Sequence, residues 1–92
     1  MTIIKSKSFE IELENIVLYI AKDSKTRALK FQKVLIQNLN QLSNMPKKFR
    51  KSIYYDDINL RDYIYKGYTI PYLINQQKNE IVILDIFKWS NH

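Results

Sequence analysis

The 92-residue chain contains no cysteine, one glycine and two prolines. Without cysteine there is no disulfide, thiolate zinc site or cysteine nucleophile, so stability must come from apolar burial, as in a reducing compartment. A single glycine cannot supply the glycine-rich loops of nucleotide-binding sites. No apolar stretch approaches the roughly 20 residues that span a bilayer, and the first residues show no uninterrupted signal-peptide core. We therefore expect a cytoplasmic protein without a membrane partner.

The residues that are present predict a globular, basic protein. Hydrophobic residues make up 46% of the chain, aromatic residues 13% and charged residues 26%. This balance fits one compact domain over residues 1–92. Fifteen Lys and Arg against nine Asp and Glu give a formal charge of +6, which favours an anionic partner such as nucleic acid or an acidic protein.

The first half of the chain predicts a short strand and two helices. Residues 2–5 form a β-branched run that is typical of a strand. Apolar residues then recur at helical spacing from Phe9 to Ile20 and from Ala28 to Leu42, ahead of Pro46. The connection between the helices is short and predicts an antiparallel hairpin. The candidate caps are Ser6 or Ser8 for the first helix and Asp23 and Ser24 for the second.

The second half predicts strands. Segments Asn59 to Tyr65 and Tyr68 to Asn75 are rich in Tyr and Ile, and Lys66-Gly67 between them predicts a two-residue hairpin turn. A second turn through residues 75–79 leads into a last strand, from Glu80 to Trp89. Pro71 cannot donate to a sheet ladder, so we expect it on an edge or at a bulge.

The resulting order is β-α-α-β-β-β, an α+β fold with a helical hairpin packed on one face of a small, mostly antiparallel sheet. Two helices cover only one face, and both faces are apolar, so we expect the uncovered face to be aromatic and to bind a protein partner. One face carries Arg61, Tyr63, Tyr65, Tyr68, Ile70 and Tyr72, and the other carries Leu60, Ile64, Pro71 and Leu73.

This order, together with Asn59-Leu60-Arg61-Asp62, Gly67-Tyr68-Thr69-Ile70-Pro71-Tyr72 and the closing stretch from Ile81 to Lys88, resembles the RelE/ParE superfamily of bacterial toxins. The resemblance covers nearly the whole chain. It implies a growth-inhibiting toxin of a type II toxin–antitoxin module, encoded beside an antitoxin that wraps and neutralises it.

The superfamily has two branches, and the residues favour one of them. RelE-like members cleave messenger RNA in the ribosome with clustered basic residues, and the resemblance places a catalytic arginine where this chain has Thr69. The terminal segment also lacks the arginines and distal tyrosine of that branch. ParE-like members poison DNA gyrase. The Leu60-Arg61 pair followed by an aromatic-rich hairpin is similar to that branch, which commonly has a histidine where this chain has Lys88.

Each candidate site residue has a structural and a functional interpretation. Arg61 lies among apolar neighbours and either pairs with Asp85 or Asp62 or binds the target. The basic run from Met45 to Ser52 is either a solvated loop or a phosphate contact. We expect target binding by Arg61, Lys88 and Trp89, and antitoxin binding by Tyr63, Tyr68, Tyr72 and Trp89. In the alternative, a ribosome-dependent messenger RNA endoribonuclease, the catalytic candidates are Arg61, Lys88 and His92.

The sequence predicts no bound cofactor or metal. Asp56 and Asp57 are adjacent, and adjacent residues on an extended chain point to opposite faces. No further ligand set has suitable spacing. A degenerate toxin that retains only antitoxin binding is a third possibility.

Overall fold

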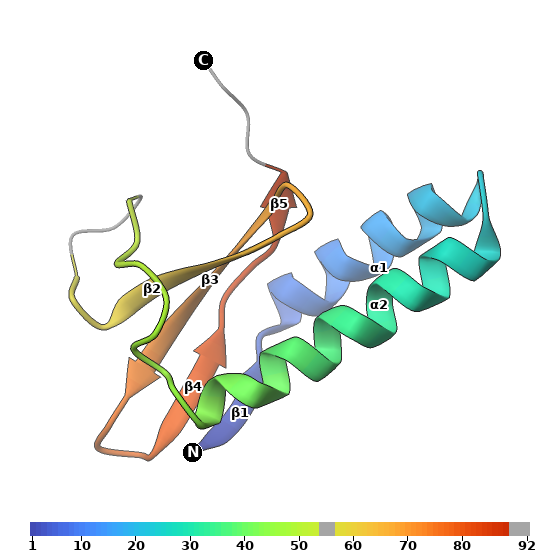
Figure 1. Ribbon diagram of the computed structural model, residues 1–92. Helices are drawn as coiled ribbons and strands as arrows, with labels where there is room; N and C mark the ends of the chain where they lie inside the picture. Colours follow the sequence, from blue (N-terminus) through green and yellow to red (C-terminus); the bar gives the residue numbers. More distant parts are fainter. Residues whose placement is uncertain (54–56, 89–92) are drawn as a thin grey trace.

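The computed structural model describes residues 1–53 and 57–88 and shows two helices packed against a mixed sheet (Figure 1). This is the predicted α+β class. In chain order the elements are β1 (Thr2–Lys5), α1 (Lys7–Ala21), α2 (Lys25–Asn40), the 3₁₀ turn η1 (Gln41–Ser43), β2 (Leu60–Tyr65), β3 (Tyr68–Asn75), β4 (Glu80–Ile83) and β5 (Phe87–Lys88).

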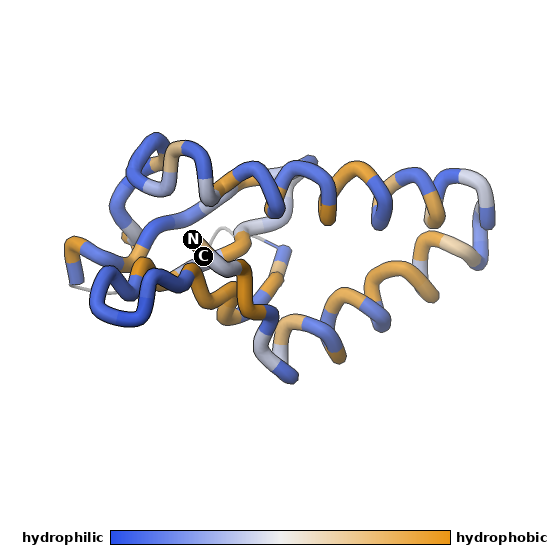
Figure 2. Tube along the Cα trace, turned by 90° about the horizontal axis from the view of Figure 1, so that it is seen from below, coloured by the Kyte–Doolittle hydropathy of each residue, from blue (hydrophilic) through white to orange (hydrophobic). Residues whose placement is uncertain are grey.

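Serine side chains start both helices, as the sequence predicts. The Ser6 Oγ accepts from the Phe9 N–H at 3.1 Å, and the Ser24 Oγ accepts from the Arg27 N–H at 3.2 Å. The Ser6 hydroxyl also donates to the Leu84 carbonyl at 2.7 Å, which ties the start of α1 to the chain after β4. Hydrophobic and hydrophilic segments alternate along both helices (Figure 2), so each helix turns one apolar stripe toward the sheet.

The sheet has the order β1-β4-β3-β2, with β1 parallel to β4 and the other pairs antiparallel. The β2–β3 hairpin has the predicted two-residue turn, because Tyr65 pairs with Tyr68 across it. Lys66 and Gly67 both have positive φ, 49° and 84°, as a primed hairpin turn requires. The short strand β5 pairs with β3 on the same side as β4.

The predicted last strand, Glu80 to Trp89, is wrong as a single element, because the described chain divides it into β4 and β5. The interruption at residues 84–86 lies beside Pro71. The Pro71 carbonyl accepts from the Leu84 N–H at 2.9 Å. In an extended strand the nitrogen and the carbonyl of one residue point toward the same neighbouring strand. Because proline has no N–H, Pro71 cannot donate the second hydrogen bond to this neighbour. Pro71 therefore sits on the central strand β3, at a break in its neighbour's ladder, instead of on an edge.

The helices cover the face of the sheet that carries the tyrosines. Register pairs Arg61 with Tyr72, Tyr63 with Ile70 and Tyr65 with Tyr68, so the predicted division of the β2–β3 residues between two faces is confirmed. The buried cluster joins both helices to this face. Its members are Phe9, Leu13, Phe31, Leu35, Leu39, Leu42, Ile70, Tyr72, Ile74, Ile81, Ile83 and Ile86.

Tyr72 is fully buried in this core, at 0% exposure. Its hydroxyl donates to the Pro46 carbonyl at 2.7 Å, which fixes the segment after η1 against β3. Burial raises the pKa of Tyr72 to about 12, with a nearby Arg61 charge lowering it and Asp62 raising it. The neutral phenol is therefore the form that the fold stabilises.

We expect Tyr72→Phe to lower the free energy of unfolding by about 1–2 kcal/mol, because the Pro46 carbonyl loses its donor. Above pH 10 the tyrosine of the unfolded chain loses its proton first, so the unfolded state binds fewer protons and wild-type stability falls as the pH rises from 10 to 12. Urea denaturation of both proteins across this range measures the effect. A wild type and variant with parallel stability profiles would contradict it.

Candidate functional site

The face of the sheet opposite the helices carries a row of aliphatic side chains across four strands. Pairing aligns Ile4 with Val82, Val82 with Leu73 and Leu73 with Leu60. Ile4 is 39% exposed, and the other three are half-buried. Ile64, at 45% exposure, lies on the same face near the hairpin turn. Exposed aliphatic side chains in such a row are a typical protein-binding surface. We call these five residues the aliphatic row.

Asp62 lies on this face in the middle of β2, with a side chain that is 0% exposed. Its Oδ2 lies 3.7 Å from Arg50 Nη2 and accepts from the Ile53 N–H at 3.4 Å. The backbone N–H of Asp62 also donates to the Arg50 carbonyl at 3.1 Å. These contacts hold the basic segment 50–53 against β2, so this part of the run is tied to the fold.

Arg61 lies on the other face and contacts the same loop from the helix side. Its Nε donates to the Ile58 carbonyl at 3.1 Å and its Nη1 to the Phe49 carbonyl at 3.3 Å. Of the two interpretations of Arg61, the internal salt bridge to Asp85 or Asp62 is not found among the described residues, where Asp62 pairs with Arg50. These two contacts tie Phe49 and Ile58 to the strand.

The structure does not bring Arg61 and Lys88 together. Arg61 pairs with Tyr72, whereas Lys88 pairs with Tyr68 on the other side of β3. Four residues along a strand correspond to about 13 Å. Lys88 is exposed. The remaining candidates, Trp89 and His92, lie outside the described residues, so a catalytic cluster of Arg61, Lys88 and His92 has no support in the described chain.

The predicted antitoxin-binding tyrosines lie beneath the helices, and the expectation that they make the uncovered face aromatic is wrong. Tyr68 packs edge-on against Phe31 of α2 at 5.5 Å between ring centroids. The Tyr63 hydroxyl accepts from Asn38 Nδ2 at 2.9 Å. Tyr63 and Tyr68 are half-buried, whereas Tyr72 is enclosed. A partner therefore reaches Tyr63 or Tyr68 only at the margin of the helix layer.

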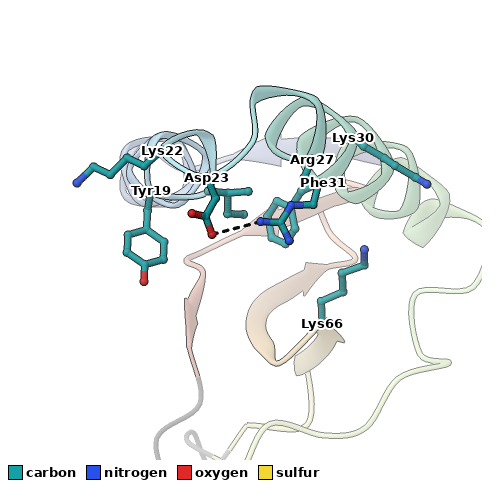
Figure 3. Close-up of a pocket in the computed structure, with 8 residues that line it drawn as sticks. Tyr19, Lys22, Asp23, Arg27, Lys30, Phe31 and Lys66 are labelled. Carbon is teal, nitrogen blue, oxygen red and sulfur yellow. Dashed lines mark hydrogen bonds and ion pairs between the residues drawn. The ribbon is translucent and has the colours of Figure 1, made fainter.

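A groove that the sequence did not predict opens between the tip of the helical hairpin and the β2–β3 turn (Figure 3). Its volume is about 580 Å³. It is lined by Tyr19, Ile20, Lys22, Asp23, Arg27, Lys30, Phe31 and Lys66. Lys66 is distant in sequence from the other lining residues, so only the tertiary fold assembles the site. The one available sequence signal was the cationic character of α2, which contains no Asp or Glu.

Two chemical classes of site find no basis in the described part of the chain. Within residues 1–53 and 57–88, no group of three or more His, Cys, Asp or Glu side chains is placed to hold a metal ion. None of the helices described there has the length and apolar character needed to cross a membrane.

Comparison with known proteins gives the family. The model of the ParE toxin of the type II toxin–antitoxin system parDE matches residues 3–91. The chain belongs to this toxin family. Membership implies an antitoxin as partner, and it supports the ParE-like branch that the hairpin residues favoured.

Among solved structures, the chain resembles one from the chromosomal ParDE toxin–antitoxin system of P. aeruginosa. The TM-score is 0.76 at 16% sequence identity, over 98% of this chain and 97% of the other. At this identity the match shows the shared fold. No curated protein matches the chain.

We expect Arg61→Ala to lower the free energy of unfolding by about 1–3 kcal/mol, because two carbonyls lose a charged donor. Amide hydrogen exchange should accelerate at residues 49–53. Arg27→Ala is the matched control, since Arg27 forms an exposed ion pair with Asp23 at 3.4 Å, worth about 0.3–0.5 kcal/mol. Equal stability of the two variants would show that Arg61 does not anchor the loop.

Proposed function

We propose that this ParE-family toxin inhibits bacterial growth by poisoning DNA gyrase and that a co-encoded antitoxin neutralises it by covering part of its surface. The observation that carries the proposal is the family match over residues 3–91. The net charge of +6 suits a toxin whose partner is acidic and whose target works on DNA.

The gyrase proposal is favoured over messenger RNA cleavage by the arrangement of basic residues. Metal-independent RNA cleavage needs several cationic or acid–base groups around one phosphate. Arg61 is held by the Phe49 and Ile58 carbonyls, Lys88 lies about 13 Å along the sheet from it, and Thr69 is uncharged and buried. A binding mechanism requires no such convergence.

For the target-binding surface we propose a direct role for Lys88 and an indirect one for Arg61. Lys88 is exposed at the hairpin end of the sheet, beside Tyr68. Arg61 contributes by holding Phe49 and Ile58 in place. Trp89 follows Lys88 in the sequence, and we retain it as a third contact.

For the antitoxin we propose that one part lies on the aliphatic row. The row crosses the sheet from β1 to β2 without a helix over it. Burying these side chains against a partner gains about 25 cal/mol for each Å² of apolar surface. The toxin's own two helices lie on the other face of the sheet and do not bury them. Tyr63 and Tyr68 at the margin of the helix layer remain candidate contacts.

The target is tested by expressing the toxin and following growth, with gyrase-linked DNA breaks measured on plasmid in vitro. We expect trapped cleavage complexes with the wild type. We expect Lys88→Ala to reduce them at least tenfold with unchanged thermal stability, because its side chain is exposed. Lys78→Ala, an exposed lysine in the β3–β4 turn, is the control. Codon-positioned cuts in translated message without DNA breaks would contradict the proposal.

The antitoxin surface is tested by Ile64→Lys. A charge in the aliphatic row should weaken antitoxin binding by tenfold or more, because the ammonium group loses its hydration on burial and the apolar contact of isoleucine is lost. Ile58→Lys is the matched control, since Ile58 is 67% exposed and lies before β2. Isothermal titration with the purified antitoxin measures both. Equal affinities for the two variants would remove the row from the interface.

A further inference from the structure

The outer side of the helical hairpin carries large apolar side chains that face solvent. Ile11 and Leu18 on α1 are 48% and 58% exposed, and Leu29 on α2 is 65% exposed. The sheet lies on the opposite side of both helices, and no further element of the described chain packs on the outer side (Figure 1). Apolar side chains that gather on one exposed surface are typical of an interaction site.

Helical spacing places these side chains in one stripe on each helix. Ile11, Glu14 and Leu18 follow one another at three and four residues on α1, and Leu29 and Lys33 are four residues apart on α2. A groove of about 490 Å³ opens between the helices, and residues of both stripes line it. We call this surface the outer seam, and it consists of Ile11, Glu14, Leu18, Leu29, Lys33 and Ile36.

The two helices of the outer seam carry opposite charges. α1 contains three glutamates and one lysine, whereas α2 contains four cationic residues and no Asp or Glu. Within residues 1–53 and 57–88, ion pairs join Asp23 to Arg27 and Arg50 to Asp62. None joins a glutamate of α1 to a base, so the charges of this acidic helix have no ionic partner in the described chain.

This division of charge selects a second copy of the chain as the occupant of the outer seam. An acidic partner would be repelled by the glutamates of α1, and a basic partner would be repelled by the cations of α2. A second copy meets both requirements when a two-fold axis runs along the seam, because α1 of each chain then lies over α2 of the other. Each acidic helix faces a cationic one in both halves of the contact.

The hairpin also sets which side chains would meet. The helices are antiparallel and joined by residues 22–24, so Leu18 and Leu29 lie at about the same distance from the turn, as do Glu14 and Lys33. Rotation about an axis along the seam keeps these levels. Leu18 of one copy therefore meets Leu29 of the second copy, and Glu14 meets Lys33. Both charged side chains are exposed in the single chain and free to form the ion pair.

We propose that the toxin associates with a second copy of itself through the outer seam, with α1 packed against α2 in both directions. Leu18 and Leu29 supply the apolar burial at the centre, and two Glu14–Lys33 ion pairs fix the register. The inference goes beyond the proposed function, because it requires neither gyrase nor the antitoxin. The aliphatic row lies on the far face of the sheet and stays accessible in such a dimer.

The first test measures the mass of the purified 92-residue chain by sedimentation equilibrium at increasing concentration. We expect the wild type to rise from 11.1 kDa toward twice that mass. Leu18→Lys should raise the dimer dissociation constant at least tenfold, because apolar contact is lost and an ammonium group is buried. Tyr19→Lys is the matched control, since Tyr19 is 71% exposed on the same helix but lies outside the seam. Circular dichroism checks that each variant is folded.

The second test reverses the charges of the proposed ion pairs. Glu14→Lys and Lys33→Glu each place like charges opposite one another in both halves, so each variant alone should dimerise at least tenfold more weakly than the wild type. Mixing equal amounts of the two variants should restore the dimer, because every side chain at position 14 then faces one of opposite sign at position 33. A mixture that stays monomeric, when the wild type dimerises, would overturn the proposed register.

Three other outcomes would overturn the inference and leave the proposed function standing. A wild type that stays at 11.1 kDa at every concentration does not self-associate. A dimer that is lost in Ile64→Lys and kept in Leu18→Lys would place the contact on the aliphatic row. If the wild type is monomeric and Leu18→Lys weakens titration with the purified antitoxin, the outer seam is an antitoxin surface.

Discussion

The structure depends on burying the tyrosine face of the β2–β3 hairpin under the helical hairpin. Phe31 of α2 contacts Tyr65 and Tyr68, and Tyr72 fills the centre of the core with 0% exposure. Each of these aromatic rings contributes a large apolar area, which matters in a chain too short to build a second core. The Tyr63 hydroxyl accepts from Asn38 and the Tyr72 hydroxyl donates to the Pro46 carbonyl, so these two hydroxyl groups remain hydrogen-bonded on burial. The chain beyond η1 is positioned by the same contacts.

Most of the architecture could be predicted because it follows from local patterns. The serine caps, the apolar stripes of both helices and the Lys66-Gly67 turn are each encoded within a few residues of the element they define. The break between β4 and β5 is only partly local. Asp85 lies within it and its Oδ1 accepts from the Ile86 N–H at 2.8 Å, but the interruption also arises where the strand meets Pro71 and the Ser6 hydroxyl. These contacts involve residues far apart in the chain, which a reading of the strand alone does not contain.

The sequence could not predict which face of the sheet the helices cover or which residues line the groove, for a related reason. Both faces of the β2–β3 hairpin are apolar, so alternation assigns residues to faces without choosing the face that receives the helices. The structure gives the aromatic face to Phe31 and leaves the aliphatic row of Ile4, Leu60, Leu73, Val82 and Ile64 uncovered. In the same way, Lys22, Lys30 and Lys66 gave no pattern along the chain, because only the docking of the helix tip over the turn brings them to one groove.

The positions of these two surfaces constrain any partner that uses both. The aliphatic row lies on the face of the sheet without helices, and the cationic groove lies on the helix side, at the tip of the hairpin. A compact domain that docks with one flat surface reaches only one of them. An extended chain that passes around the edge of the sheet reaches both, and it gains apolar burial on one side and ion pairing on the other. Linking two modest contacts in one chain raises the overall affinity through effective concentration, so a partner that used both surfaces would bind tightly without a large interface at either one.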